Sequence, residues 1–144
     1  WHYFSIRIPI NMRNNILLVA VLCFFIVQAP RAQESDIIEN IAGYFRSSNT
    51  QELSKYFAST VELTILEEED VYSKVQAEII LKDFFTKHSP SSIKTLHRLN
   101  SNPTYRLGVL SMATDNGKFR VSFSMKNTSG KFVITEISIK TTEE

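Results

Sequence analysis

The chain has 144 residues, the length of one ordinary domain, and 43% of them are hydrophobic, enough to bury a core. Lys and Arg total 16 against 15 Asp and Glu, and a net charge of +1 gives no basic surface of the kind that binds nucleic acid. A single cysteine excludes an internal disulfide framework and a cysteine-ligated metal site. Composition therefore predicts one folded domain with no nucleic-acid partner, no metal and no cofactor.

Residues 12–32 follow the order of a secretory signal peptide. Arg13 precedes an apolar run of twelve residues, 16–27, and the small residues Ala29 and Ala32 follow it. A helix that spans a bilayer needs about 20 apolar residues, so a permanent membrane anchor is the weaker alternative. We expect cleavage after Ala32 and a periplasmic or secreted protein.

The predicted cleavage divides the chain into three parts. Residues 1–11 precede the first Met and are interpreted as an upstream extension from a misplaced start codon. The signal peptide follows, and residues 33–144 form a single mature domain that contains no cysteine.

Three helices are predicted in the first half of the mature chain. Apolar residues recur at helical spacing from Ile37 to Phe45, after Ser35 as a candidate N-cap. Capping boxes at Asn49/Glu52 and Ser73/Gln76 begin a short second helix and a longer third helix that ends near His88. The third is the strongest local pattern in the sequence.

Strand periodicity occurs once between the helices and then throughout the second half. Apolar and polar residues alternate over Val61–Ile65, and the four carboxylates that follow, 67–70, are expected to form an exposed loop. The later strands form an antiparallel meander and are expected at Ile93–Leu99, Tyr105–Thr114, Phe119–Met125 and Phe132–Ile139.

Two turns set which side chains share a face. Asn116-Gly117 is a favoured two-residue hairpin turn that would pair Asp115 with Lys118. A three-residue loop, 128–130, is preferred at the next turn, because a two-residue loop would turn Glu136 inward. The core face then holds Phe119, Val121, Phe123 and Met125, facing Gly108, Leu110, Met112 and Thr114 on one side and Val133, Thr135, Ile137 and Ile139 on the other.

Four short stretches of the mature chain carry a family resemblance: Leu53–Phe57, Val61–Ile65, Tyr72–Phe85 and Asn116–Val121. Taken together they resemble one family of exported bacterial proteins, known as domain of unknown function 4783, and the resemblance extends over essentially the whole mature chain. The order of elements is similar to the cone-shaped fold of the nuclear transport factor 2-like superfamily. The resemblance implies an α+β fold with N-terminal helices packed on a curved antiparallel sheet, and it brings no catalytic residues.

A cone of this kind can hold a small apolar molecule between the third helix and the sheet. The candidates for lining that pocket are His97, Tyr72, Phe84 and Phe123. Alternation places His97 beside Ile93 and Thr95 on the inner face, where a histidine can act as a general base. The competing interpretations are a hydrogen-bonded core histidine or one at the rim of the sheet for His97, and a hydrophobic staple for Tyr72.

Three functional hypotheses follow. The leading one is an exported, non-catalytic domain that binds a small apolar ligand or a protein partner. The second is a small isomerase or hydro-lyase that uses His97, although no carboxylate is placed to orient it. The third is a structural homodimer.

The homodimer hypothesis rests on the outer face of the sheet. The predicted register leaves five apolar residues uncovered there, Tyr105, Leu107, Val109, Phe132 and Ile134, bordered by Arg120, Lys126 and Lys140. An apolar cluster with a polar rim has the composition of a contact surface.

Cleavage after Ala32 gives a first testable expectation. Mass spectrometry of the exported protein should find a mature N-terminus at Gln33. An intact chain that starts at Met12 and fractionates with the inner membrane would contradict both cleavage and export.

Overall fold

The computed structural model describes residues 36–142, so the predicted signal peptide lies outside the described residues. The elements are α2 (Ile37–Arg46), α3 (Thr50–Ser54), β1 (Phe57–Ile65), β2 (Glu68–Ser73), α4 (Lys74–Lys87), β3 (Pro90–Leu99), β4 (Tyr105–Thr114), β5 (Gly117–Thr128) and β6 (Lys131–Thr141). No helix in this part of the chain is long and apolar enough to span a bilayer.

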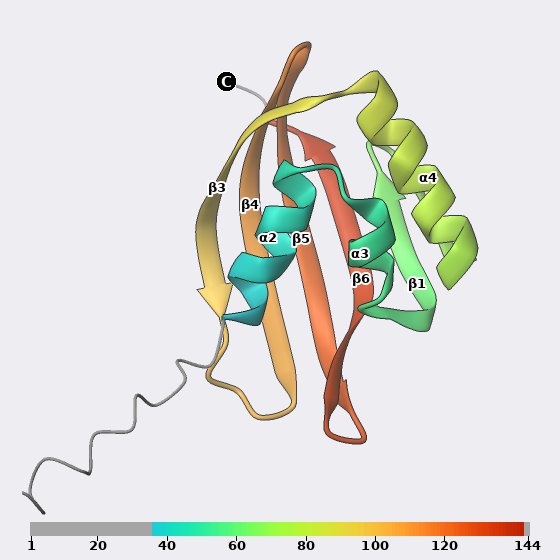
Figure 1. The fold of residues 1–144 in the computed structure, drawn as a ribbon, viewed down its shortest axis with the longest axis vertical. Coiled ribbons are helices and arrows are strands. Elements are labelled where there is room, and N and C mark those ends of the chain that lie inside the picture. The colour runs from blue at the N-terminus through green and yellow to red at the C-terminus, as the bar shows by residue number, and fades with distance from the viewer. Residues whose placement is uncertain (1–35, 143–144) are drawn as a thin grey trace, which may run out of the picture. The chain divides into compact units, whose positions relative to one another are not determined.

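One six-stranded sheet carries the domain, in the order β2-β1-β6-β5-β4-β3. All neighbouring strands are antiparallel except β1 and β6, which pair in parallel. The helices lie against one face of this sheet: α2 crosses β3 and β4, and α4 lies along β1 and β2 (Figure 1). The α+β class and the curved sheet covered by helices are as predicted.

The helix starts follow their capping residues. Ser73 and Gln76 form the predicted capping box of α4, and the Asn49 side chain accepts a hydrogen bond from the Glu52 amide at the start of α3. The N-cap of α2 is Asp36 instead of Ser35. Its carboxylate accepts from the Ile38 amide at 3.0 Å, and a carboxylate is favoured at this end of the helix dipole.

Residues 68–70 of the acidic segment lie in strand β2, so the prediction of a loop is wrong for them, whereas Glu67 lies in the turn and all four carboxylates are exposed, as predicted. Leu66 and Glu67 form a two-residue turn that pairs Ile65 with Glu68 and returns the chain along β1. The carboxylates are tolerated because β2 is an edge strand on which they stay exposed, and charges are common on sheet edges.

The first hairpin of the meander differs from its predicted register by two residues. Thr114 pairs with Gly117, so Asp115 and Asn116 are the central residues of the turn and Asp115 does not pair with Lys118. The Asn116 side chain links the turn to α4: its Oδ1 accepts from Thr114 Oγ1 within the hairpin, and its Nδ2 donates to the Lys87 carbonyl, each at 3.1 Å. A shift of two preserves every face, because side chains alternate with a period of two.

The second hairpin has a two-residue turn, Ser129-Gly130, with positive φ at both positions, and the predicted three-residue loop is wrong. A β-bulge at Thr135 inserts one residue between the Met125–Ile134 and Ser124–Glu136 pairs. Glu136 therefore stays exposed as predicted.

The inner residues of β6 are consequently Ile134, Ile137 and Ile139, all fully buried. Val133 and Thr135 are not in the buried core, which corrects their predicted placement. The bulge reverses the alternation once, so the prediction is wrong before it and right after it.

The core lies between the helices and the inner face of the sheet. The Phe123 ring stacks on Phe45 of α2 at a centroid distance of 6.0 Å, and Phe45 meets Phe85 of α4 edge to face. Gly108 makes room for this ring, since a Cβ there would lie 2.4 Å from a Phe123 ring carbon. Helices and sheet are therefore joined through one aromatic cluster.

Phe123→Ala should lower the free energy of unfolding by about 3 to 5 kcal/mol, because it removes a buried ring and leaves a cavity. Ser122→Ala, next to it on the outer face, should have almost no effect. Denaturant melts of both variants measure the difference. Equal losses, or a greater loss at Ser122, would show that the faces of β5 are reversed.

Candidate functional site

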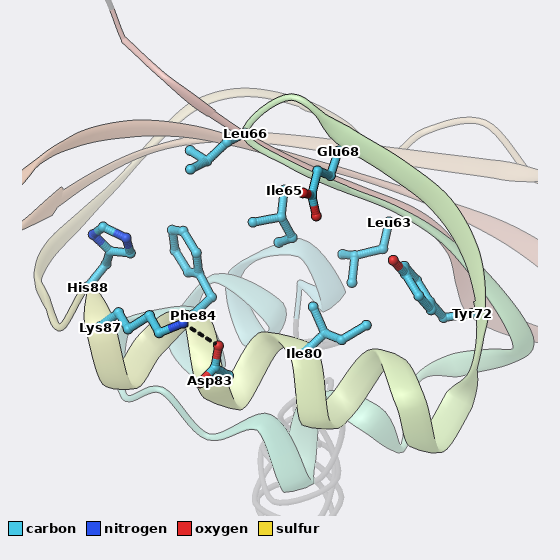
Figure 2. A pocket seen from close by; sticks show the side chains of 10 residues that line it. All are labelled: Leu63, Ile65, Leu66, Glu68, Tyr72, Ile80, Asp83, Phe84, Lys87 and His88. Carbon is cyan, nitrogen blue, oxygen red and sulfur yellow. Dashed lines mark ion pairs between the residues drawn. The ribbon is translucent and has the colours of Figure 1, made fainter.

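A pocket of about 260 Å³ opens between α4 and the β1–β2 hairpin. Figure 2 shows its lining side chains, which come from the hairpin on one side and α4 on the other. They are Leu63, Ile65, Leu66, Glu68, Tyr72, Ile80, Asp83, Phe84, Lys87 and His88. The volume lies just below the range of about 300 to 1,000 Å³ that is common for ligand sites, so a ligand would be small.

Apolar side chains form the inner wall of the pocket. Leu63 and Ile65 reach it because alternate residues of β1 point to the helical face of the sheet. Ile80 and Phe84 are four residues apart on α4 and thus lie on the same side of the helix. The pocket is continuous with the core along this wall.

Charged groups lie at its outer side. Lys87 forms an ion pair with Asp83, with 3.0 Å between Nζ and Oδ2. Glu68 projects from β2 toward α4 (Figure 2), on the face that it shares with its β1 partner Ile65. No ion pair involves Glu68 among the residues that the structure describes.

His88 closes the end of the pocket at the C-terminus of α4. Its ring packs on Phe84 at a centroid distance of 4.7 Å, and its Nδ1 lies 2.7 Å from Oδ1 of Asn116. Asn116 donates through Nδ2 to the Lys87 carbonyl, which directs Oδ1 at the histidine. Nδ1 is therefore the donor, and Nε2 is the acceptor of the neutral ring.

Leu66 covers the pocket at the hairpin tip. Its φ is +58°, a backbone conformation that is strained for a bulky residue, and its side chain is 39% exposed. Glycine or asparagine usually fills such a turn position. A leucine there gains apolar contact with the pocket in exchange for backbone strain.

The structure separates the four predicted pocket residues. Tyr72 and Phe84 line the pocket. Phe123 lies deeper, in the core, with 1% of its surface exposed. His97 is exposed and pairs with Val109 on the outer face of the sheet, because a bulge at Leu96 reverses the alternation after Thr95.

Glu68, Lys87 and His88 are pocket residues that the sequence analysis missed. Glu68 was assigned to a solvated loop, and its place in the pocket depends on the Leu66-Glu67 turn. For His88 the sequence analysis gives only its place near the end of the third helix. Its four-residue spacing from Phe84 is the sequence pattern that could have indicated its position on the same side of the helix.

The predicted contact surface also changes. Tyr105, Leu107 and Val109 lie on the outer face and are half-buried. Ile134 points into the core, opposite Met125. Phe132 shares the inner side with Ile134, and the Arg106 guanidinium lies 4.2 Å above its ring. The bulge at Thr135 causes both corrections.

Carboxylates of three adjacent strands meet on the outer face near the hairpin. Glu62 of β1 pairs with Glu136 of β6, and Glu69 lies across from Thr64 on the same face. A side-chain hydrogen bond with Glu69 and the charge of Glu136 raise the pKa of Glu62 above its usual range. In residues 36–142 no three Asp, Glu, His or Cys side chains are arranged to hold a metal ion.

A family model, described as a domain of unknown function (DUF4783), matches residues 38–140, which is almost all of the helix and sheet domain. The chain belongs to the DUF4783 family. A comparison with curated proteins gives no match.

Crystal structures of two DUF4783 proteins superpose on this chain. The protein from Bacteroides uniformis is 30% identical, with a TM-score of 0.72, and the match covers 76% of this chain and 100% of that one. The protein from Bacteroides ovatus is 28% identical, with a TM-score of 0.68 and coverage of 72% and 94%.

More distant structures show the fold alone. A calcium/calmodulin-dependent protein kinase II association domain from Xanthomonas campestris is 14% identical, with a TM-score of 0.56 and coverage of 75% and 84%. Together with designed NTF2-like proteins among the neighbours, it places this DUF4783 domain in the nuclear transport factor 2-like fold.

Proposed function

We propose that this DUF4783 domain is a non-catalytic binding module whose pocket between α4 and the β1–β2 hairpin holds a small, largely apolar ligand. The apolar wall of Leu63, Ile65, Ile80 and Phe84 carries this proposal. An apolar wall with a few polar groups at one side is the usual composition of a small-molecule site.

The position of the histidines favours binding over catalysis. The isomerase hypothesis needs His97 in the cavity, but His97 lies on the opposite face of the sheet. His88 does line the pocket, but its Nδ1 is hydrogen-bonded to the side-chain amide oxygen of Asn116 and not to a carboxylate. A catalytic histidine is usually oriented and polarised by a carboxylate at its second ring nitrogen, and among the described residues no carboxylate holds His88 in this way.

We further propose that binding takes place in the periplasm or outside the cell. The support is the order of basic residue, apolar run and small residues in the segment 12–32. Native mass spectrometry of protein purified from its own host would detect a ligand that is retained through purification.

Filling the pocket tests the proposed function. In an NMR titration with octanol, we expect shifts at the amides of β1, β2 and α4 that line the pocket. Ile80→Trp should weaken octanol binding at least about tenfold, because the larger ring occupies the pocket. Ile79→Trp is the matched control, since Ile79 is 62% exposed on the solvent side of α4 and should leave binding unchanged.

Octanol that shifts no pocket amide, or that binds both variants equally, would contradict the pocket as the site. The melting temperatures of both variants should remain close to wild type, which separates loss of the pocket from loss of the fold.

A second candidate function is self-association through the outer face of the sheet. Tyr105, Leu107 and Val109 of β4 form the apolar part of this face, which lies opposite the side covered by the helices. The distant neighbour from Xanthomonas campestris is an association domain of the same fold. The occupant proposed for this face is a second copy of the chain.

Leu107→Arg should convert such a dimer into a folded monomer, since it places an unpaired charge in the contact. Sedimentation at micromolar concentration measures the change. Wild type that sediments as a monomer would overturn self-association, and unfolding of the variant would show that Leu107 belongs to the core.

A further inference from the structure

We propose that the ligand of the pocket is a small amphipathic amine, with its apolar body against α4 and β1 and its cationic group at Glu68. This inference rests on the proposed function and adds the chemical class of the ligand. It follows from the charges and hydrogen-bonding groups that the pocket offers.

The charged side chains of the pocket leave one negative charge unmatched. Asp83 and Lys87 neutralise each other across 3.0 Å. The Glu68 carboxylate is then the remaining lining charge, and none of the described Lys or Arg residues pairs with it within 4.0 Å. A ligand that enters between α4 and the hairpin meets an acidic group at its outer end.

The neighbouring groups strengthen this negative potential. Glu67, Glu69 and Asp70 adjoin Glu68 on the same hairpin, and no ion pair involves them within residues 36–142. Lys140 lies beside the hairpin tip with Glu67 and Glu68, and its positive charge offsets one of the four carboxylates, 67–70. Several carboxylates close together attract a cation over about 10 Å at moderate salt.

The hydrogen-bonding groups of the pocket point to the same class. A carboxylate accepts hydrogen bonds only. The Nδ1 of His88 donates to Asn116, so its Nε2 is an acceptor whenever the ring is neutral. The Lys87 ammonium is engaged by Asp83, with Nζ 3.0 Å from Oδ2. Acceptors at the edge of a pocket select a ligand that donates, and an ammonium group has three donors.

A matched series of octylamine, octanol and octanoate tests the inference, since the three probes share a chain and differ in head-group charge. Titrations are followed by the amide shifts of the pocket residues at low and high salt. We expect octylamine to bind most tightly and octanoate most weakly. The preference for octylamine over octanol should shrink as salt is raised, because screening weakens the ionic contribution.

Two charge-matched variants locate the contact. Glu68→Gln should weaken octylamine binding about twofold to fivefold, which is the range of an exposed ion pair, and leave octanol binding unchanged. Glu69→Gln removes the same charge from the same hairpin, but Glu69 faces the outer side of the sheet. Its effect on octylamine should be smaller than that of Glu68→Gln.

The outcomes separate this inference from the proposed function. If none of the three probes shifts the pocket residues, the pocket is not the site and both proposals fail. If octanol binds and octylamine binds no more tightly, or octanoate binds best, the pocket stands and the amine is excluded. Equal losses in the two variants would overturn the contact with Glu68.

Discussion

The fit of the Phe123 ring against Gly108 is the constraint on which the rest of the domain depends. Only a residue without a side chain leaves room for that ring, since a Cβ on residue 108 would lie 2.4 Å away. From Phe123, a chain of aromatic contacts runs through Phe45 and Phe85 to Phe84. The ring centroids of each neighbouring pair are 6.0 Å apart or closer. This contact sets where α2 and α4 rest on the sheet.

The same packing explains why the pocket lies at one edge. Under α2 the space above the sheet is filled by fully buried side chains such as Ile38, Ile41 and Phe45. Toward β1 and β2, α4 is the helix that covers the sheet, and Phe84 and Phe85 are its aromatic contacts with the core. At this edge of the sheet, the tip of the β1–β2 hairpin, including Leu66, forms the pocket wall opposite α4.

Local patterns predicted the helices and most strands, because capping boxes and alternation depend on residues close in sequence. The position of the pocket residues depends on a turn and on β-bulges, which these local patterns do not reveal. Placing Glu68 required knowing that a leucine adopts a positive φ at a turn. To place His97 and Ile134, one would have to know that β-bulges occur at Leu96 and Thr135. These bulges accommodate the bending of the strands and cannot be recognised from the hydrophobic alternation of the sequence.

The bulge at Thr135 has a consequence for how the length of this chain can vary among relatives. Without Thr135, the residues from Phe132 to Ile139 would alternate regularly and keep their partners on β5. Loss of one residue is therefore harmless to the faces of β6 at this position, whereas loss between Ile137 and Ile139 would turn the end of the strand inside out. Single-residue gaps in this hairpin should collect at the bulge.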